Sequence, residues 1–204
     1  MLVVQQNELN KVGVVLIARQ TSSRLPNKVL LEINGKKLIE IILEKVLLNT
    51  KNYIFAIPEN NENLILRNFL EDNCFHYFAG SDKDVLGRFI GASKELNCKF
   101  IQRLNCDNLL FNPSYMRNCY ESLDDVSDVY TNVNFPNHSG SSVEIIRKEK
   151  CLITREPTEY ESEHVFPYFY ANQDLSVVGL KGPEEKVFPI DTKSDFEKAM
   201  AFFT

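Results

Sequence analysis

The sequence predicts an α/β fold built on a mostly parallel sheet. Short apolar runs that suit buried strands alternate with amphipathic patterns that suit helices along most of the chain. No linker, low-complexity tract or internal repeat interrupts this alternation. With 204 residues, of which 44% are hydrophobic, the chain can bury a sizeable core. We therefore expect one domain over residues 12–204, preceded by an N-terminal extension over residues 1–11.

The first half of the chain contains three β/α units. An apolar strand is expected over residues 12–18, and an amphipathic helix follows from about residue 37 to residue 48. The strand "YIFAI" at 53–57 precedes a helix on 61–73, and a short strand follows at 75–79. Because strands separated by helices pair in parallel, this half should form the parallel part of the sheet.

The second half continues this rhythm and then changes character. A helix is expected near 85–96 and a strand at 99–104, and Pro113 can begin the next helix because proline suits a first helical turn. The stretches 128–132 and 141–147 are typical of strands joined by a polar turn. We expect this later portion of the sheet to be mixed or antiparallel.

The loop after the first strand, "IARQTSSRLPNKVL" at 17–30, is too polar to continue a strand. It contains Arg19, Arg24 and Lys28, although the whole chain has a net charge of -5. That net charge argues against nucleic-acid and membrane partners, so a basic loop on this protein suggests one specific anion, such as a polyphosphate. The alternative is a solvated surface turn, which Pro26–Asn27 would suit.

The cysteines indicate a reducing compartment. Their number is odd, they form no C-x-x-C pair of the kind that holds zinc, and no apolar leader begins the sequence. These features favour the cytoplasm, and the longest apolar runs are too short to span a bilayer. The five cysteines are Cys74, Cys98, Cys106, Cys119 and Cys151.

Asp107 gives the basic loop an acidic counterpart. It follows the strand at 99–104, and the carboxyl ends of parallel strands meet at one crevice where ligands bind. Cations and a carboxylate in one crevice would suit a nucleoside triphosphate with its divalent metal. The sequence contains neither G-x-x-x-x-G-K-[ST] nor G-x-G-x-x-G after the first strand, so the three cations would act with Ser22, Ser23 and backbone N–H groups.

The loop also resembles a known family signature. "ARQTSSRLPNKVL" is similar to A-R-x-x-S-x-R-L-P-x-K-x-L of the cytidylyltransferases that activate sugar acids, the acylneuraminate and 3-deoxy-manno-octulosonate enzymes. It is most similar to their SpsF-like relatives in spore coat polysaccharide biosynthesis. Further matches follow in order at "GKKL", "GSDKDVLGRF", "ESEHVFPYFY" and "FPIDTKSDFE", so the resemblance extends over about residues 12–197. The matching positions in the loop are Ala18, Arg19, Ser22, Arg24, Leu25, Pro26, Lys28 and Leu30.

This resemblance implies a fold and a reaction. The fold is that of the nucleotide-diphospho-sugar transferases, a GT-A-like, Rossmann-like three-layer arrangement with a mostly parallel mixed sheet. An acceptor oxygen attacks the α-phosphate of CTP, which gives a CMP-linked sugar for a surface polysaccharide or glycan and releases pyrophosphate. Because charge accumulates on the pentavalent phosphorus, the catalytic groups should be cations and metal ligands. The implied partners are CTP, a small sugar-type acceptor and a second copy of the chain in a homodimer.

Site residues carry over by position. The implied catalytic residues are Arg19, Lys28, Asp107 and Asp191, with Asp107 and Asp191 binding Mg²⁺. The implied nucleotide-binding residues are Ala18, Arg19, Ser22, Ser23, Arg24, Lys28, Asp84 and Arg88, and the implied acceptor-binding residues are Glu144 and His164.

Each of these roles has a structural alternative. Asp191 could be the N-cap of the last helix, and Asp107 could be an ordinary turn residue. Asp84 and Arg88 could form an exposed ion pair at i, i+4. His164 could serve helix packing or a dimer contact, and the aromatic stretch 164–171 around it suits either a dimer interface or a helix buried in the monomer.

The chain also departs from the family pattern. "NCDNL" replaces T-G-D-C-P, which puts Asn105 and Cys106 at positions of small residues. Ser142 replaces an aspartate, and Val187 lies where an arginine is usual. Two alternatives therefore stay open beside the cytidylyltransferase. One is an enzyme of the same fold with another nucleotide or a phosphorylated acceptor, and the other is a non-catalytic nucleotide-binding relative.

Overall fold

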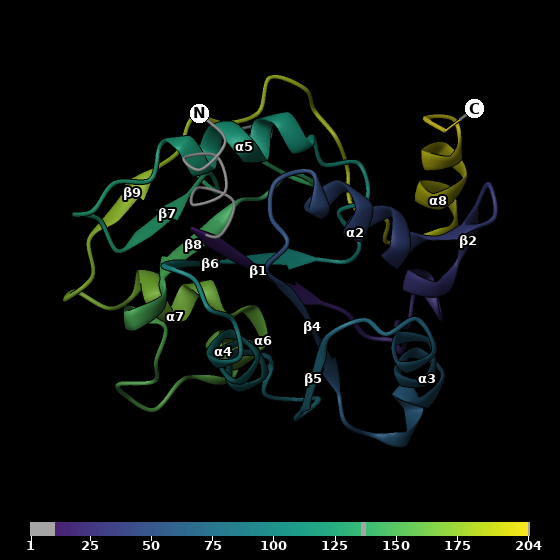
Figure 1. Cartoon of the computed structure of the whole chain (residues 1–204), viewed down its shortest axis with the longest axis horizontal. Helices are drawn as coiled ribbons and strands as arrows, with labels where there is room; N and C mark the ends of the chain where they lie inside the picture. Colours follow the sequence, from purple (N-terminus) through teal and green to yellow (C-terminus); the bar gives the residue numbers. More distant parts are fainter. Residues whose placement is uncertain (1–10, 136–137, 204) are drawn as a thin grey trace.

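A seven-stranded mixed sheet forms the centre of the molecule in the computed structural model, which describes residues 11–135 and 138–203 (Figure 1). The strand order is β5-β4-β1-β6-β8-β7-β9, and β2 and β3 form a separate small hairpin. The strands are β1 (Val12–Ile17), β2 (Glu32–Ile33), β3 (Lys36–Lys37), β4 (Tyr53–Pro58), β5 (Tyr77–Gly80), β6 (Phe100–Asn105), β7 (Val129–Thr131), β8 (Glu144–Arg147) and β9 (Val177–Gly179).

Strands β5, β4, β1 and β6 are mutually parallel, as the alternation of strands and helices predicts. Most of their residues are apolar on both faces, and helices cover both sides of this part of the sheet. The helices are α2 (Leu38–Leu47), α3 (Leu64–Asp72), α4 (Val85–Lys94), α5 (Pro113–Glu121), α6 (Glu159–His164), α7 (Phe166–Tyr170) and α8 (Lys193–Met200).

Alternate residues of the central strand separate the two sides of the core. Leu16 packs with α2 and α3 in one cluster, whereas its neighbour Val15 packs with α4 and α7 in another. Helices α2, α3, α5 and α8 thus lie on one side of the sheet, and α4, α6 and α7 lie on the other (Figure 1). This is the three-layer arrangement that the family resemblance implies.

The other half of the sheet is mixed. Strand β8 is antiparallel to both β6 and β7, which confirms the prediction of an antiparallel portion. Strand β9 pairs in parallel with β7 at the edge and is not predicted, because three residues are too few to show a periodic pattern. In the turn between β7 and β8, residues 136–137 lie outside the described part, as do residues 1–10 of the expected N-terminal extension. The division into an extension and one domain therefore remains a prediction.

The aromatic segment after α6 is buried inside the monomer. The exposed fractions of Phe166, Tyr168 and Phe169 are 1% or less, and all three pack in the core on the α4 side of the sheet. Val165, which separates α6 from α7, has a φ of 68°, a strained value for a β-branched residue. Of the two uses that the sequence leaves open for this segment, core packing accounts for the aromatic residues, and the homodimer stays a prediction.

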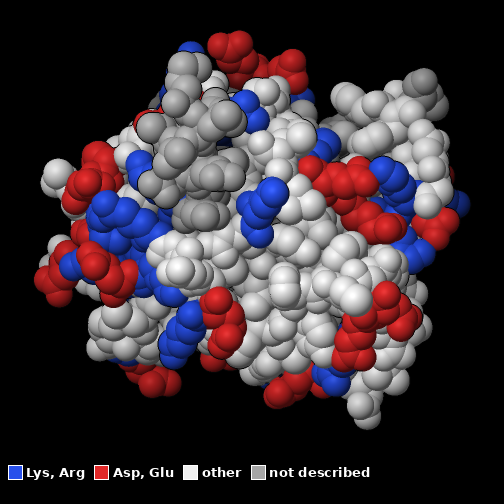
Figure 2. Space-filling view, in the orientation of Figure 1, with Lys and Arg blue, Asp and Glu red and all other residues white. Residues whose placement is uncertain are grey.

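Charged side chains of both signs are interspersed on the face shown in Figure 2, around a broad uncharged centre. The basic side chains on its left have acidic neighbours, so the described residues on this face form no surface of a single sign. Within the described part of the chain, no helix combines the length and the apolar character that a membrane crossing requires.

Candidate active site

The basic loop begins at the carboxyl end of β1 and is held by the start of α3. The Gln20 backbone N–H donates to Asn63 Oδ1 at 2.7 Å, and the Leu66 N–H donates to Gln20 Oε1 at 3.2 Å. Asn63 is fully buried. The loop closes on itself where the Asn27 N–H donates to the Gln20 carbonyl at 3.1 Å. Its cations therefore project from a backbone that is fixed at several points.

Lys28 joins the two carboxylates that the sequence assigns to a metal. Its Nζ lies 2.8 Å from Asp107 Oδ2 and 3.2 Å from Asp191 Oδ1. Arg24 NH2 lies 3.1 Å from the same Asp191 oxygen. We call Lys28, Asp107 and Asp191 the lysine–carboxylate cluster. It unites the opening loop, the end of β6 and the segment before α8.

Main-chain bonds bring these segments together. Ile17 and Asn105 are neighbours in the parallel ladder, and the Cys106 N–H donates to the Ile17 carbonyl at 3.0 Å. The Ile190 N–H donates to the Asp107 carbonyl at 2.8 Å, which places Asp191 beside Asp107. The two carboxylates thus meet because the backbones that carry them are bonded to each other.

Thr192 caps the last helix, so Asp191 is not its N-cap. The Thr192 Oγ1 accepts from the Asp195 N–H at 3.2 Å, and the Asp195 carboxylate accepts in return from the Thr192 N–H at 2.8 Å. This reciprocal pair satisfies the helix start. The side chain of Asp191 is left to face Lys28 and Arg24.

The two carboxylates suit a magnesium ion that also takes oxygens from phosphate and water. They converge on one ammonium group, so each has a lone pair directed at a common cation position. Within residues 11–135 and 138–203, no group of three or more His, Cys, Asp or Glu side chains could hold a metal. Magnesium commonly binds to only one or two carboxylates plus substrate phosphates. Asp107 and Asp191 would hold such an ion together with the substrate.

A cavity of about 250 Å³ extends from this cluster along the α4 side of the sheet. It also contains Asn105, Cys106 and Glu163, whereas three predicted site residues, Ala18, Asp84 and Glu144, do not line it. A shallower hollow of about 510 Å³ lies on the other side of the loop, beside Gln20 and Glu62. The cavity brings together the predicted residues Arg19, Ser22, Ser23, Arg24, Lys28, Arg88, Asp107, His164 and Asp191.

Asp84 and Arg88 do not form the exposed ion pair that their spacing allows. Asp84 caps α4, accepting from the Gly87 N–H at 2.8 Å. A Cβ at Gly87 would lie 2.1 Å from the Asp84 carboxylate, so a larger residue there would force this carboxylate to shift. Arg88 is buried and reaches the cavity from the same helix turn.

Arg103 is a cavity residue that the sequence analysis does not single out. It lies opposite Glu144 in the β6–β8 ladder and forms an ion pair with that carboxylate. It also donates to the His164 carbonyl at 2.8 Å. The hydroxyl of Tyr170 donates to the other Glu144 oxygen at 2.8 Å. An arginine inside a strand predicted for the centre of the sheet is the sequence signal that could have identified it.

His164 and Glu144 occupy different places relative to the cavity. His164 lines it, with its ring 4.3 Å from that of Tyr160. Glu144 lies behind Arg103 and uses both carboxylate oxygens on protein partners. Burial raises the pKa of the Tyr170 hydroxyl, and the adjacent Glu144 charge raises it further, so Tyr170 is a stable donor. Glu144 therefore acts on the cavity through Arg103.

The departures from the family pattern fall at different distances from the site. The Cys106 thiol is buried beside Asp107, and burial raises its pKa, which makes it an inert packing group. Asn105 faces the cavity. Ser142 does not line it and instead donates to the His138 carbonyl at 3.2 Å.

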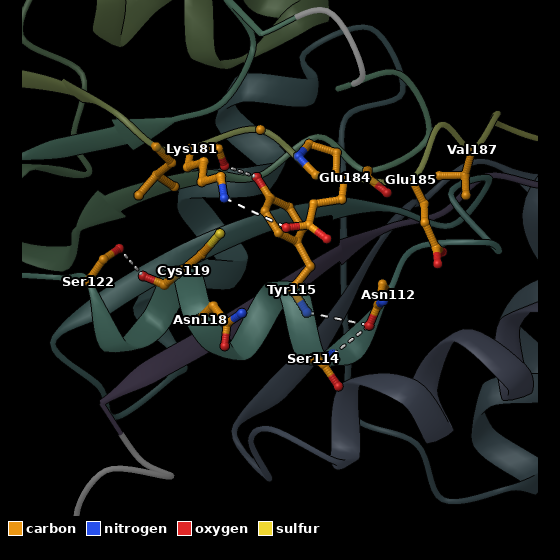
Figure 3. A pocket seen from close by; sticks show the side chains of 14 residues that line it. Asn112, Ser114, Tyr115, Asn118, Cys119, Ser122, Lys181, Glu184, Glu185 and Val187 are labelled. Atoms are coloured by element: carbon orange, nitrogen blue, oxygen red, sulfur yellow. Dashed lines mark hydrogen bonds and ion pairs between the residues drawn. The ribbon is translucent and has the colours of Figure 1, made fainter.

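Val187 borders a separate cavity of about 330 Å³ between α5 and the segment 180–187 (Figure 3). Ser114, Asn118 and Ser122 lie along the helix side of this cavity. The Tyr115 side chain extends from the helix to the opposite segment, where its hydroxyl donates to the Lys181 carbonyl at 2.7 Å. None of the predicted site residues lines this cavity.

The basic loop and Asp107 follow the parallel strands β1 and β6, and Asp191 is held beside Asp107, an arrangement that suits a nucleotidyltransferase. The model of the family described as "Cytidylyltransferase" matches residues 14–202, so the chain belongs to this family. It is accordingly a CTP-dependent nucleotidyltransferase, and the family assignment made from the loop motif is confirmed.

Known relatives cover nearly all of the chain. The uncharacterized protein MJ1063 of Methanocaldococcus jannaschii is 30% identical, and the match covers 90% of this chain and 79% of that protein. The spore coat polysaccharide biosynthesis protein SpsF of Bacillus subtilis is 27% identical, and the match covers 96% of this chain and 87% of SpsF. A solved cytidylyltransferase from Leptospira borgpetersenii matches with a TM-score of 0.82 at 24% identity, covering 94% of this chain and 85% of that one. These matches confirm the predicted fold class.

Proposed function

We propose that the protein transfers CMP from CTP to a hydroxyl of a sugar acid or a related sugar, with release of pyrophosphate, for a surface polysaccharide or glycan. The observation that carries this proposal is the lysine–carboxylate cluster, which shares one cavity with three further cationic side chains from the loop and α4. The similarity to SpsF supports a role in polysaccharide biosynthesis.

The proposed reaction is an in-line displacement at the α-phosphorus. A bond forms from the acceptor oxygen to that phosphorus, the bond to the bridging oxygen of the β-phosphate breaks, and the acceptor hydroxyl loses its proton. Lys28 and Arg24 stabilise the charge on the phosphate oxygens from fixed positions. Magnesium, held by Asp107 and Asp191, would neutralise further phosphate charge when bound. The chain therefore contributes mainly positioning and electrostatics.

The acceptor would lie at the α6 end of the cavity. His164 and Arg103 line this end, and the buried Glu144 fixes the Arg103 guanidinium. An arginine has five N–H donors, so Arg103 retains donors for a carboxylate or hydroxyl of the acceptor after bonding to Glu144 and the His164 carbonyl. We assign His164 to direct acceptor contact and Glu144 to the positioning of Arg103.

The test is a matrix of nucleotides and acceptors. The protein is incubated with each of CTP, UTP, ATP and GTP, with magnesium, and with sugar acids, neutral sugars or sugar phosphates, while pyrophosphate release is followed. Turnover with CTP alone and a sugar acid or neutral sugar supports the proposal. Turnover with another nucleotide, or only with a sugar phosphate, supports the alternative of an enzyme with the same fold but a different nucleotide or a phosphorylated acceptor. CTP binding without turnover on any acceptor supports a non-catalytic relative.

Two further parts of the proposal, the metal and the homodimer, have separate tests. Removing magnesium with a chelator should abolish turnover, because the proposed reaction needs the ion that Asp107 and Asp191 would hold. Sedimentation would measure whether the chain forms the proposed homodimer. All five cysteines are free thiols, which supports the proposed cytoplasmic location.

A further inference from the structure

The cavity between α5 and the segment 180–187, which we call the α5 cavity, differs in charge from the active site (Figure 3). Its described lining contains one lysine and two glutamates, and no arginine or histidine. Lys181 Nζ lies 3.7 Å from Glu184 Oε1, so these two charges offset each other. Glu185 has no ion-pair partner among the described residues. The lining is therefore net negative, which disfavours phosphates, nucleotides and sugar acids as occupants.

The helix side of the α5 cavity offers neutral hydrogen-bonding groups. Ser114, Asn118 and Ser122 follow one another at intervals of four residues, so they lie on one face of α5 and its C-cap. The Asn118 amide can both donate and accept, and it has no hydrogen-bond partner within residues 11–135 and 138–203. The Ser122 hydroxyl donates to the Cys119 carbonyl at 2.7 Å and keeps lone pairs that can accept. This face can therefore bond ligand hydroxyls in both directions.

A buried hydrogen-bond network holds the two walls of the α5 cavity together. The Tyr115 hydroxyl donates to the Lys181 carbonyl at 2.7 Å and accepts from Asn132 Nδ2 at 2.8 Å. Asn132 is fully buried, and it also donates to the Ser141 carbonyl at 2.9 Å. These bonds join α5, the end of β7 and the segment 180–187. The cavity is thus formed before a ligand arrives, which lowers the ordering cost of binding.

The size and surface of the α5 cavity suit one sugar ring. Its volume is about 330 Å³, near the lower end of the range of about 300–1,000 Å³ for small-molecule sites. The buried side chains of Leu180, Pro183 and Val187 supply apolar surface beside the polar groups. A pyranose has C–H groups on its faces and hydroxyls around its edge, so it matches such a mixed lining. A carboxylate such as that of Glu185 also accepts strong hydrogen bonds from hydroxyls.

We propose that the α5 cavity is a second binding site of this protein, for a neutral sugar. Asn118 and Ser122 bond the sugar hydroxyls from the helix, and the Glu185 carboxylate accepts from hydroxyls on the opposite side. The site is separate from the acceptor end of the active-site cavity, which His164 and Arg103 line. None of the predicted site residues lines the α5 cavity, so the inference does not depend on the proposed function.

The test measures binding of glucose, galactose and N-acetylglucosamine to the whole chain by saturation-transfer NMR. We expect at least one of these sugars to bind, and Asn118→Leu and Glu185→Gln each to weaken that binding about 3- to 10-fold, because each removes hydrogen bonds to the ligand. Both positions are exposed, so both variants should fold. Asn68→Leu is the matched control, since it makes the same exchange at an exposed position of α3 that does not line the cavity. His164→Ala should also leave sugar binding unchanged.

Glucuronic acid and glucose 1-phosphate, which add negative charge to the same ring, test the charge of the ligand and should show no binding that depends on Asn118. Such binding would contradict a site for a neutral sugar. Absence of binding by all three neutral sugars would overturn the inference, as would sugar binding that Asn118→Leu and Glu185→Gln leave unchanged. Loss of sugar binding in His164→Ala would place the sugar at the acceptor end of the active-site cavity and would also overturn it.

Discussion

Arg103→Met should destabilise the fold more than any surface arginine change. The side chains of Arg103 and Glu144 are only 16% and 6% exposed. After the substitution Glu144 keeps the Tyr170 hydroxyl but loses its cation, and removing one partner of a buried ion pair costs about 3–5 kcal/mol. For a chain of this length that cost lowers the melting temperature by about 6–20 °C.

The assay is urea and thermal unfolding of Arg103→Met, Glu144→Gln and the double variant, with Arg117→Met as a surface control. The double variant should lose less free energy of unfolding than the two single losses added together, because the second change removes a group that the first leaves unpaired. A loss below about 0.5 kcal/mol for Arg103→Met, or strict additivity, would show that the pair is solvated and would refute the reasoning. In folded samples of Arg103→Met, the KM for the acceptor should rise while CTP affinity stays at the wild-type level.

Three further predictions concern charged residues, two at the site and one in α6. Arg24→Ala should weaken CTP binding about tenfold in a calorimetric titration, since it removes one phosphate contact, and unchanged CTP affinity would contradict the role of the loop. Asp191→Ala should lower metal-dependent kcat at least about a hundredfold, because metal stabilisation of phosphate charge is worth several kcal/mol; a wild-type magnesium response in steady-state kinetics would contradict this. A hydrogen bond from Arg155 helps to lower the pKa of Glu161 to about 2, from an ordinary value of 4.5. The stability it adds is therefore complete above pH 4.5 and is lost as the pH falls towards 2, and Glu161→Gln should flatten this part of a pH–stability curve measured by urea unfolding.

The parallel half of the fold could be predicted because its strands are mainly apolar runs, each with a helix after it. The break at Val165 could not, because its positive φ has no local sequence signal; the residue is fully buried in the same core cluster as the aromatic residues that follow it. Strand β9 is too short and too exposed for its sequence to distinguish it from a loop. What the local sequence encodes was predictable, and what tertiary packing imposes was not.

The same distinction separates the two ends of the site. The basic loop and Asp107 could be placed together because both follow parallel strands, whose carboxyl ends meet. Arg103 was missed because its partner Glu144 lies far along the chain, and only the antiparallel register of β6 and β8 makes them neighbours. Thr192, rather than Asp191, caps α8, a one-residue distinction that the sequence pattern leaves open.

The hydrogen bond from the Ile190 N–H to the Asp107 carbonyl has a consequence for how this site tolerates substitution. Both partners are main-chain atoms, so no side-chain replacement at residue 107 or 191 removes the bond. Proline at position 190 would remove the bond, since proline has no N–H to donate. Exchanging either aspartate for asparagine should accordingly change the charge of the site while leaving its geometry in place.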